Sequence, residues 1–256
     1  MQFEVGRARI QLDAALGGRL SSLCIDGREV LVTQSDDPRG WGCYPMVPWA
    51  GRVHSGQFSW KNRLVQLPVN CGPHSIHGTV LERPWRLEAP GVLSCSLGSD
   101  WPWAGTIRSE FVLSSAQLVW TMTVMAKAEP FPVVLGWHPW FRRTLSPGAD
   151  LRYSLEAAEM YVRDDAGIPS GEIKAPATGP WDDCFRELHA NPTLQWSDGF
   201  EIEMSSTCDH WVLYDEPDHA VCIEPQSGPP DGFNLGCFEV AMPGAPVQHS
   251  MTLRWV

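Results

Sequence analysis

The chain has 256 residues, of which 43% are hydrophobic and 19% charged, near the ordinary values for folded proteins. Its formal net charge of −11 opposes long-range attraction to nucleic acid or to an anionic membrane surface, because both carry negative charge. The densest basic spot is the pair Arg142 and Arg143, which is too small to offset that repulsion. The composition predicts a folded protein with no nucleic-acid or membrane partner.

The chain contains no run of about 18 apolar residues, which a membrane-spanning helix would need. Residues 1–13 lack the basic stretch followed by an apolar one that is typical of a signal peptide. We therefore expect a cytoplasmic protein. The eight cysteines are scattered without a C-x-x-C pair, so reduced structural thiols are expected rather than a zinc ribbon or a disulfide scaffold.

Short strand-like runs follow one another along the chain between 23 glycines and 22 prolines, which leave no room for long helices. These runs lie at residues 7–12, 64–69, 109–113, 117–126, 133–136, 201–204, 210–214, 220–224 and 250–256. The run 118–125 has apolar groups on both faces, as in a strand between two packed layers. We find no internal repeat and no domain boundary, so a single all-β domain is predicted for residues 1–256.

Two connecting segments are informative. Residues 163–181 are rich in Gly, Pro, Ala and Asp without a sustained period, which predicts a long ordered loop. Residues 215–219 form a polar loop with a proline between two apolar runs, which predicts a hairpin. This hairpin would place Glu224 at the end of a strand.

Four segments combine ionisable residues with Gly, Pro and Trp, the setting in which binding and catalytic groups concentrate. They are 48–52 (PWAGR), 74–78 (HSIHG), 136–141 (GWHPWF) and 224–228 (EPQSG). Glu224 follows an apolar run, so its carboxylate is expected to be partly desolvated, with a raised pKa that suits a proton acceptor. The alternative is a surface glutamate at a strand end.

His138 lies among Trp137, Pro139, Trp140 and Phe141, whose aromatic bulk could orient an imidazole or stack on a sugar ring. The unperturbed pKa of histidine is the nearest to neutrality of any side chain, which suits proton transfer. A core histidine bonded to a backbone carbonyl is the alternative. The chain has thirteen tryptophans, most of which are expected in the core.

His74 and His77 form an H-x-x-H pattern, but the glycines and Pro73 around them disfavour the helix on which this pattern binds metal. We therefore expect no metal and no cofactor. Arg52 offers five fixed donors suited to sugar hydroxyls or a carboxylate, whereas a surface ion pair would explain it equally well.

Taken together and in order, the four segments resemble the aldose 1-epimerase family, also called galactose mutarotases, over roughly residues 51–234. The segments GR, GQF and IHG resemble the family's arginine, glycine–phenylalanine and histidine–glycine pattern, so His77 rather than His74 corresponds to the first family histidine. His138 in HPWF is similar to the second family histidine. Glu224 in CIEPQ is similar to the family's base.

The resemblance implies a β-supersandwich fold and a sugar-handling isomerase that interconverts the α and β anomers of an aldose. It implies that Glu224 removes the proton of the C1 hydroxyl, that His138 donates a proton to the ring oxygen, and that His77 assists. The residues expected to hold sugar hydroxyls are Arg52, Gln226 and an aspartate that precedes a phenylalanine by three, which falls on Asp182 or on its neighbour Asp183.

Two other functions fit the sequence. The first is a hexose 6-phosphate mutarotase of the same fold, with Arg83, Arg86, Arg142 and Arg143 as candidate phosphate partners. The second is a carbohydrate-binding protein without turnover, which would not need the acid–base set. The chain is shorter than typical galactose mutarotases and has HPWF where many members have H-x-Y-F, so the sugar stays open, as does the choice between monomer and homodimer.

Overall fold

The computed structural model of the chain describes residues 1–146 and 148–256. Over this range, helix is confined to α1 (Gly232–Leu235) and a 3-10 turn at His54–Gly56, and strands dominate. The all-β prediction is confirmed. None of the helices in the described part of the chain is long and apolar enough to cross a membrane.

One large antiparallel sheet contains twelve strands in the described residues. Its main path is β1 (Gln2–Val5), β2 (Ala8–Asp13), β3 (Arg19–Ile25), β5 (Cys43–Met46), β15 (Gly136–Pro139), β24 (Ala220–Gln226), β23 (His210–Tyr214), β20 (Asp182–Leu188), β18 (Ala157–Arg163) and β19 (Pro169–Lys174). Two short strands join it at the side, β4 (Arg28–Glu29) on β3 and β16 (Phe141–Arg142) on β24.

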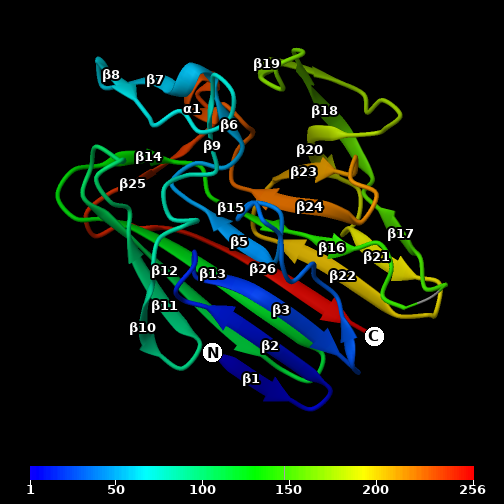
Figure 1. Ribbon diagram of the computed structural model, residues 1–256. Coiled ribbons are helices and arrows are strands. Elements are labelled where there is room, and N and C mark those ends of the chain that lie inside the picture. Colours follow the sequence, from blue (N-terminus) through cyan, green and yellow to red (C-terminus); the bar gives the residue numbers. More distant parts are fainter. Residues whose placement is uncertain (147) are drawn as a thin grey trace.

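The second large sheet has eight strands within the same residues. In spatial order they are β10 (Arg86–Ala89), β11 (Val92–Ser96), β12 (Gly105–Leu113), β13 (Gln117–Ala126), β26 (Val247–Trp255), β22 (Glu201–Ser206), β21 (Thr193–Trp196) and β17 (Leu151–Ser154). Smaller pairs are β6 (Arg52–Val53) with β9 (Ser75–Ile76), β7 (Gln57–Trp60) with β8 (Arg63–Gln66), and β14 (Phe131–Val133) with β25 (Glu239–Ala241). In Figure 1, β6 to β9 and α1 gather at the top of the view.

The two large sheets share one hydrophobic core. Strand β13 shows how the sequence builds it, because alternate residues such as Trp120 and Met122 are fully buried while the residues between them are half-exposed. Successive side chains of a strand point to opposite faces, so β13 sends one face into the core. The expectation that both faces of this strand are covered is therefore wrong, whereas the sandwich that it indicated is confirmed.

Most predicted strands correspond to strands in the structure, and those at 117–126 and 210–214 match β13 and β23 residue for residue. The run 133–136 is wrong in detail, because Val134 and Leu135 separate β14 from β15. The predicted loop 163–181 contains a strand, β19, which pairs with β18. Five of the six residues of β19 are exposed, so its sequence lacks the apolar alternation that marks a half-buried strand.

Strands β23 and β24 form the predicted hairpin. Their register runs from Tyr214–Cys222 near the loop to His210–Gln226 at the far end. Strand β24 continues beyond Glu224, so this residue lies inside the strand and the expected position at its end is wrong. Glu224 is only 2% exposed, which confirms the predicted desolvation of its carboxylate.

The ladder on the other side of β24 is interrupted. Strand β15 pairs with β24 at Gly136–Gln226, and β16 resumes the pairing at Phe141–Val221. Within the residues described, no ladder pair joins the strands between these two points. Pro225 lies in this interval and has no N–H to donate, which explains how a central strand tolerates it. The interruption leaves room for side chains between the strands.

Candidate active site

A row of side chains crosses four neighbouring strands of the twelve-stranded sheet. The register places Glu224 of β24 beside Val212 of β23, and Val212 beside Cys184 of β20. Tyr161 extends the row onto β18, the next strand. All four residues line one cavity of about 450 Å³. This face of the sheet is therefore the floor of the cavity.

The same cavity brings together all the residues that the sequence predicts for sugar chemistry. Those residues are Glu224, His138, His77, Arg52, Asp182 and Gln226. They come from β24, β15, β6, β20 and the turn after β9, so segments separated by up to 174 positions along the chain meet at one place. Their roles in binding and catalysis stay predictions.

Glu224 and His138 form the centre of the site. Nε2 of His138 lies 3.2 Å from Oε1 of Glu224, and their side chains are 7% and 3% exposed. The contact spans the interrupted part of the ladder between β15 and β24. The second carboxylate oxygen accepts a hydrogen bond from Nε2 of Gln226 at 3.3 Å. Each oxygen of Glu224 thus has a polar neighbour that fixes its direction.

Burial sets the protonation of this pair. Desolvation raises the pKa of Glu224 well above its ordinary range, and the negative charge of Asp182 adds to the rise. Desolvation lowers the pKa of His138 to about 3. Both shifts favour the uncharged forms, so when the pair holds one proton, the carboxyl group is the favoured place for it. Moving that proton across the contact gives a carboxylate and an imidazolium without exchange with solvent.

Aromatic rings hold the imidazole of His138 in place. Tyr44 stacks on it with a centroid distance of 4.8 Å, and Trp140 stacks on it at 5.4 Å. His77 meets it edge to face at 5.1 Å. Of the tryptophans in the described residues, Trp140 lines the cavity, while most of the others are core residues as expected. Stacked π faces also favour an imidazolium when it forms.

His77 owes its position to a left-handed turn. Its φ is 61° and that of Gly78 is 78°, and a Cβ added to Gly78 would lie 2.0 Å from the carbonyl oxygen of Val47. Burial and the neighbouring His138 lower the pKa of His77 well below its ordinary value, so this imidazole is neutral. His74 lies apart from the cavity lining, and its Nδ1 accepts the backbone N–H of Ser55 at 3.1 Å.

Among the described residues, three arginines line the cavity, and each is paired with an aspartate. The pairs are Arg52–Asp182 at 3.2 Å, Arg163–Asp183 at 2.7 Å and Arg39–Asp37 at 2.9 Å. Asp182 lines the cavity, whereas Asp183 does not belong to the lining among the described residues. Burial raises the pKa of Asp182, and the charge of Arg52 opposes that rise. The positive charge at the cavity is thus locally balanced.

The four arginines considered as phosphate partners do not line this cavity within the described chain, so that expectation is wrong. Arg142 donates to the carbonyl oxygen of Leu31, and Arg143 donates to three backbone carbonyls around the β23–β24 loop. Both side chains therefore hold loops together. Arg86 is the first residue of β10 in the other large sheet, and Arg83 lies three residues before it.

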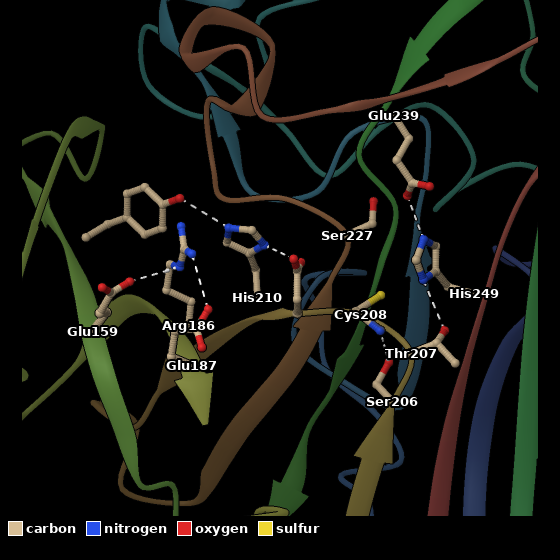
Figure 2. A network of polar contacts seen from close by, with 12 residues as sticks. Glu159, Arg186, Glu187, Ser206, Thr207, Cys208, His210, Ser227, Glu239 and His249 are labelled. Atoms are coloured by element: carbon tan, nitrogen blue, oxygen red, sulfur yellow. Dashed lines mark hydrogen bonds and ion pairs between the residues drawn. The ribbon is translucent and has the colours of Figure 1, made fainter. Parts of the chain in front are cut away.

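Tyr161 is a cavity residue that none of the sequence motifs indicates. Its hydroxyl lies 3.1 Å from Nε2 of His210, whose Nδ1 lies 2.6 Å from the carboxylate of Asp209. Figure 2 shows His210 within this polar network, next to Arg186. Because a carboxylate only accepts, it favours a proton on Nδ1, which leaves Nε2 to accept a hydrogen bond from the hydroxyl of Tyr161. The oxygen of Tyr161 then keeps its lone pairs for another donor.

One group of side chains in the described residues has the composition of a metal site. His138, Cys222 and Glu224 are all buried, and their potential ligand atoms lie within 4.8 Å of one another. The three come from β15 and β24, with Cys222 two residues before Glu224 on the same face of the strand. Nitrogen, sulfur and oxygen donors of this kind suit zinc.

The fold and its cavity define a class of protein, the galactose mutarotase-like β-supersandwiches. The model of the aldose 1-epimerase family matches residues 13–254. The chain therefore belongs to the aldose 1-epimerase family, and the family and fold implied by the sequence are confirmed. One relative is YphB of Escherichia coli (strain K12), an uncharacterized protein, which is 26% identical over 243 residues and 83% of each chain.

Solved structures give the same fold at low sequence identity. A galactose mutarotase-like protein from Clostridium acetobutylicum superposes with a TM-score of 0.87 at 18% identity, covering 100% of this chain and 94% of that one. Galactose 1-epimerase from Lactobacillus acidophilus NCFM superposes with a TM-score of 0.80 at 17% identity, covering 99% and 92%. These similarities establish the architecture.

Proposed function

We propose that the chain is an aldose 1-epimerase that interconverts the α and β anomers of a free aldose. The observation that carries this proposal is the buried contact between Glu224 and His138, 3.2 Å long, at a cavity of about 450 Å³. Mutarotation needs one base and one acid that act on two oxygens bound to the same carbon. A pair of groups that share one proton meets that requirement.

The reaction starts from the charged form of the pair. The Glu224 carboxylate takes the proton of the C1 hydroxyl, the electron pair of the broken O1–H bond forms the second C1–O1 bond of the carbonyl, and the bond between C1 and the ring oxygen breaks. The ring oxygen takes the electron pair of that bond and a proton from the His138 imidazolium. The products are the open-chain aldehyde, a neutral carboxyl group and a neutral imidazole, which is the protonation that burial favours.

Ring closure reverses these steps after rotation about C1–C2, so attack on either carbonyl face gives either anomer. His77 is neutral and adjoins His138, and it would donate to the carbonyl oxygen of the open form. The groups that would hold the remaining hydroxyls are Arg52, Asp182 and Gln226. The oxygen of Tyr161 would accept a hydrogen bond from a sugar hydroxyl at the far end of the floor.

Charge balance favours a free sugar over a phosphorylated one. Each of the three arginines at the cavity is already paired with an aspartate. A phosphate dianion would have to displace a carboxylate or lie against one, whereas sugar hydroxyls can donate to aspartate and accept from arginine at once. Glucose 6-phosphate is therefore expected to be turned over less efficiently than glucose.

The buried acid–base pair also favours turnover over binding alone. Removing a carboxylate and an imidazole from water costs free energy, and binding of a neutral polyol does not require such a pair. A binding protein could hold the sugar with Arg52, Asp182 and Trp140 alone.

Polarimetry of freshly dissolved α-D-glucose and α-D-galactose tests the proposal. We expect equilibration faster than in buffer, and a loss of roughly 10²- to 10⁴-fold in kcat for Glu224→Gln and His138→Gln. Glu172→Gln, at an exposed position on β19 outside the cavity lining, is the matched control and should keep full activity. Sugar binding by calorimetry with equilibration at the buffer rate would instead identify a binding protein.

A further inference from the structure

Cys222 is a buried thiol next to the acid–base pair, and mutarotation makes no use of it. The residue is 0% exposed and free of any disulfide. It shares the face of β24 that carries Glu224, and its sulfur lies within 4.8 Å of the potential ligand atoms of Glu224 and His138. A buried free cysteine packs as a small hydrophobic residue, and this one also places a possible sulfur ligand beside the acid–base pair.

The distances allow a metal ion to bind these three groups with small side-chain movements. Ligand atoms in a tetrahedral zinc site lie roughly 3.3–3.8 Å apart, given bonds of about 2.0–2.3 Å. Nε2 of His138 and Oε1 of Glu224 are already 3.2 Å apart, and all three donor atoms lie within 4.8 Å. Moving the sulfur closer by at most about 1 Å would place three ligands at the corners of a tetrahedron. Water would occupy the fourth corner.

The charges of such a site also balance. A thiolate, a carboxylate and a neutral imidazole together carry two negative charges, which a divalent ion cancels. The ion would release two protons, one from the Cys222 thiol and one from the pair formed by Glu224 and His138. A neutral assembly is the arrangement that a buried environment tolerates best.

We propose that His138, Cys222 and Glu224 bind Zn²⁺, or another thiophilic divalent cation, next to the cavity and thereby block the acid–base pair. The ion is an inhibitor and not a cofactor, because it occupies both groups that would transfer protons to and from the sugar. Binding of the ion is independent of the proposed function, whereas the inhibition rests on it. Sugar and metal then compete for the same carboxylate.

Cadmium provides a direct probe of the site, because a bond between Cd²⁺ and a thiolate absorbs in the ultraviolet. Titrating the full chain with Cd²⁺ should give a thiolate band that saturates at one ion per chain after subtraction of the Cys222→Ser titration. Cys222→Ala serves as a second variant if a buried hydroxyl harms folding. His138→Gln should weaken the band, because a ligand is lost.

Cys184→Ser is the matched control, since Cys184 is a buried free thiol on the floor of the same cavity. It lies two strands away from Glu224 in register and is not part of the group of potential ligands within the described chain. This variant should keep the Cd²⁺ band. Equal bands in the wild type and in Cys222→Ser, or a band that disappears in Cys184→Ser, would overturn the proposal.

Inhibition is measured separately by polarimetry with added Zn²⁺. We expect Zn²⁺ to slow mutarotation, a chelator to restore it, and Cys222→Ser to need at least tenfold more Zn²⁺ for the same inhibition. Unchanged inhibition of this variant would refute the role of the thiol. If the chain has no mutarotase activity, the proposed function fails, while the Cd²⁺ titration still decides whether the metal site exists.

Discussion

The imidazole of His138 and the carboxyl group of Glu224 are 3.2 Å apart in a part of the sheet where their two strands form no ladder pairs within the described residues. Two prolines, Pro139 and Pro225, lie in this gap and lack the N–H groups that would close it. The backbone thus creates the space in which an acid and a base can face each other while buried.

This contact predicts a broad, bell-shaped pH dependence of kcat/KM. A second proton on the pair requires an imidazolium beside a neutral carboxyl group, which burial disfavours by lowering the pKa of His138 to about 3. Loss of the single proton requires an ionised Glu224, whose pKa is raised well above its ordinary value. The one-proton form, and with it activity, should persist through neutral pH and fall on both sides.

The profile is measured by polarimetry across pH, with the buffer-catalysed rate subtracted at each point. A single sigmoid centred near the ordinary imidazole pKa of about 6.5 would contradict a shared proton and indicate an isolated histidine.

Asp182→Asn should move the alkaline limb of this profile to lower pH. The charge of Asp182 raises the pKa of Glu224, and Asp182 also neutralises Arg52, whose charge acts in the opposite direction. Without the Asp182 carboxylate, its negative charge no longer raises the pKa of Glu224. The charge of Arg52 is also no longer neutralised, so the pKa of Glu224 falls. The same change at Asp183, which pairs with Arg163, should shift the limb less. Equal shifts for the two variants would argue against Asp182 as the cavity aspartate.

Tyr161→Phe should raise KM about fivefold while kcat changes little. The phenol oxygen is expected to accept one hydrogen bond from the sugar, worth about 1 kcal/mol, far from the reacting carbon. Burial raises the pKa of Tyr161 to about 12, so the hydroxyl stays protonated and keeps its bond to His210 in any assay near neutral pH.

Tyr153→Phe is the control for this change, because Tyr153 bonds Asp215 and does not line the cavity within the described residues. Its KM should match that of the wild type. A drop in kcat with unchanged KM for Tyr161→Phe would indicate that the tyrosine acts in the proton-transfer step rather than in sugar binding.

Gly78→Ala should destabilise the fold and disturb His77. A left-handed φ costs an alanine roughly 1–2 kcal/mol, and the added Cβ would also lie 2.0 Å from the carbonyl oxygen of Val47. Gly27→Ala is the matched control, since Gly27 has the same φ of 78° with nothing within 4 Å of the added atom. Urea unfolding should show Gly78→Ala to be less stable than the control by at least about 2 kcal/mol.

The sequence predicts strands well where one face is buried and poorly where it is not. Strand β13 alternates buried and half-exposed residues along its whole length, and its predicted limits are correct. Strand β19 is exposed along almost its whole length, so its residues carry no pattern by which to find it. The prediction of a long loop at residues 163–181 was wrong for that reason.

Short segments around Glu224, His138 and His77 were enough to indicate the family and to name the central candidate residues, because each segment combines an ionisable group with turn-forming neighbours. The strand order, the choice of Asp182 over Asp183 at the cavity, the chain from Tyr161 to Asp209 and the place of Cys222 beside the acid–base pair were decided by tertiary structure. Local alternation determines which residues form strands, whereas contacts between distant segments depend on sheet register and on the interrupted ladder beside β24.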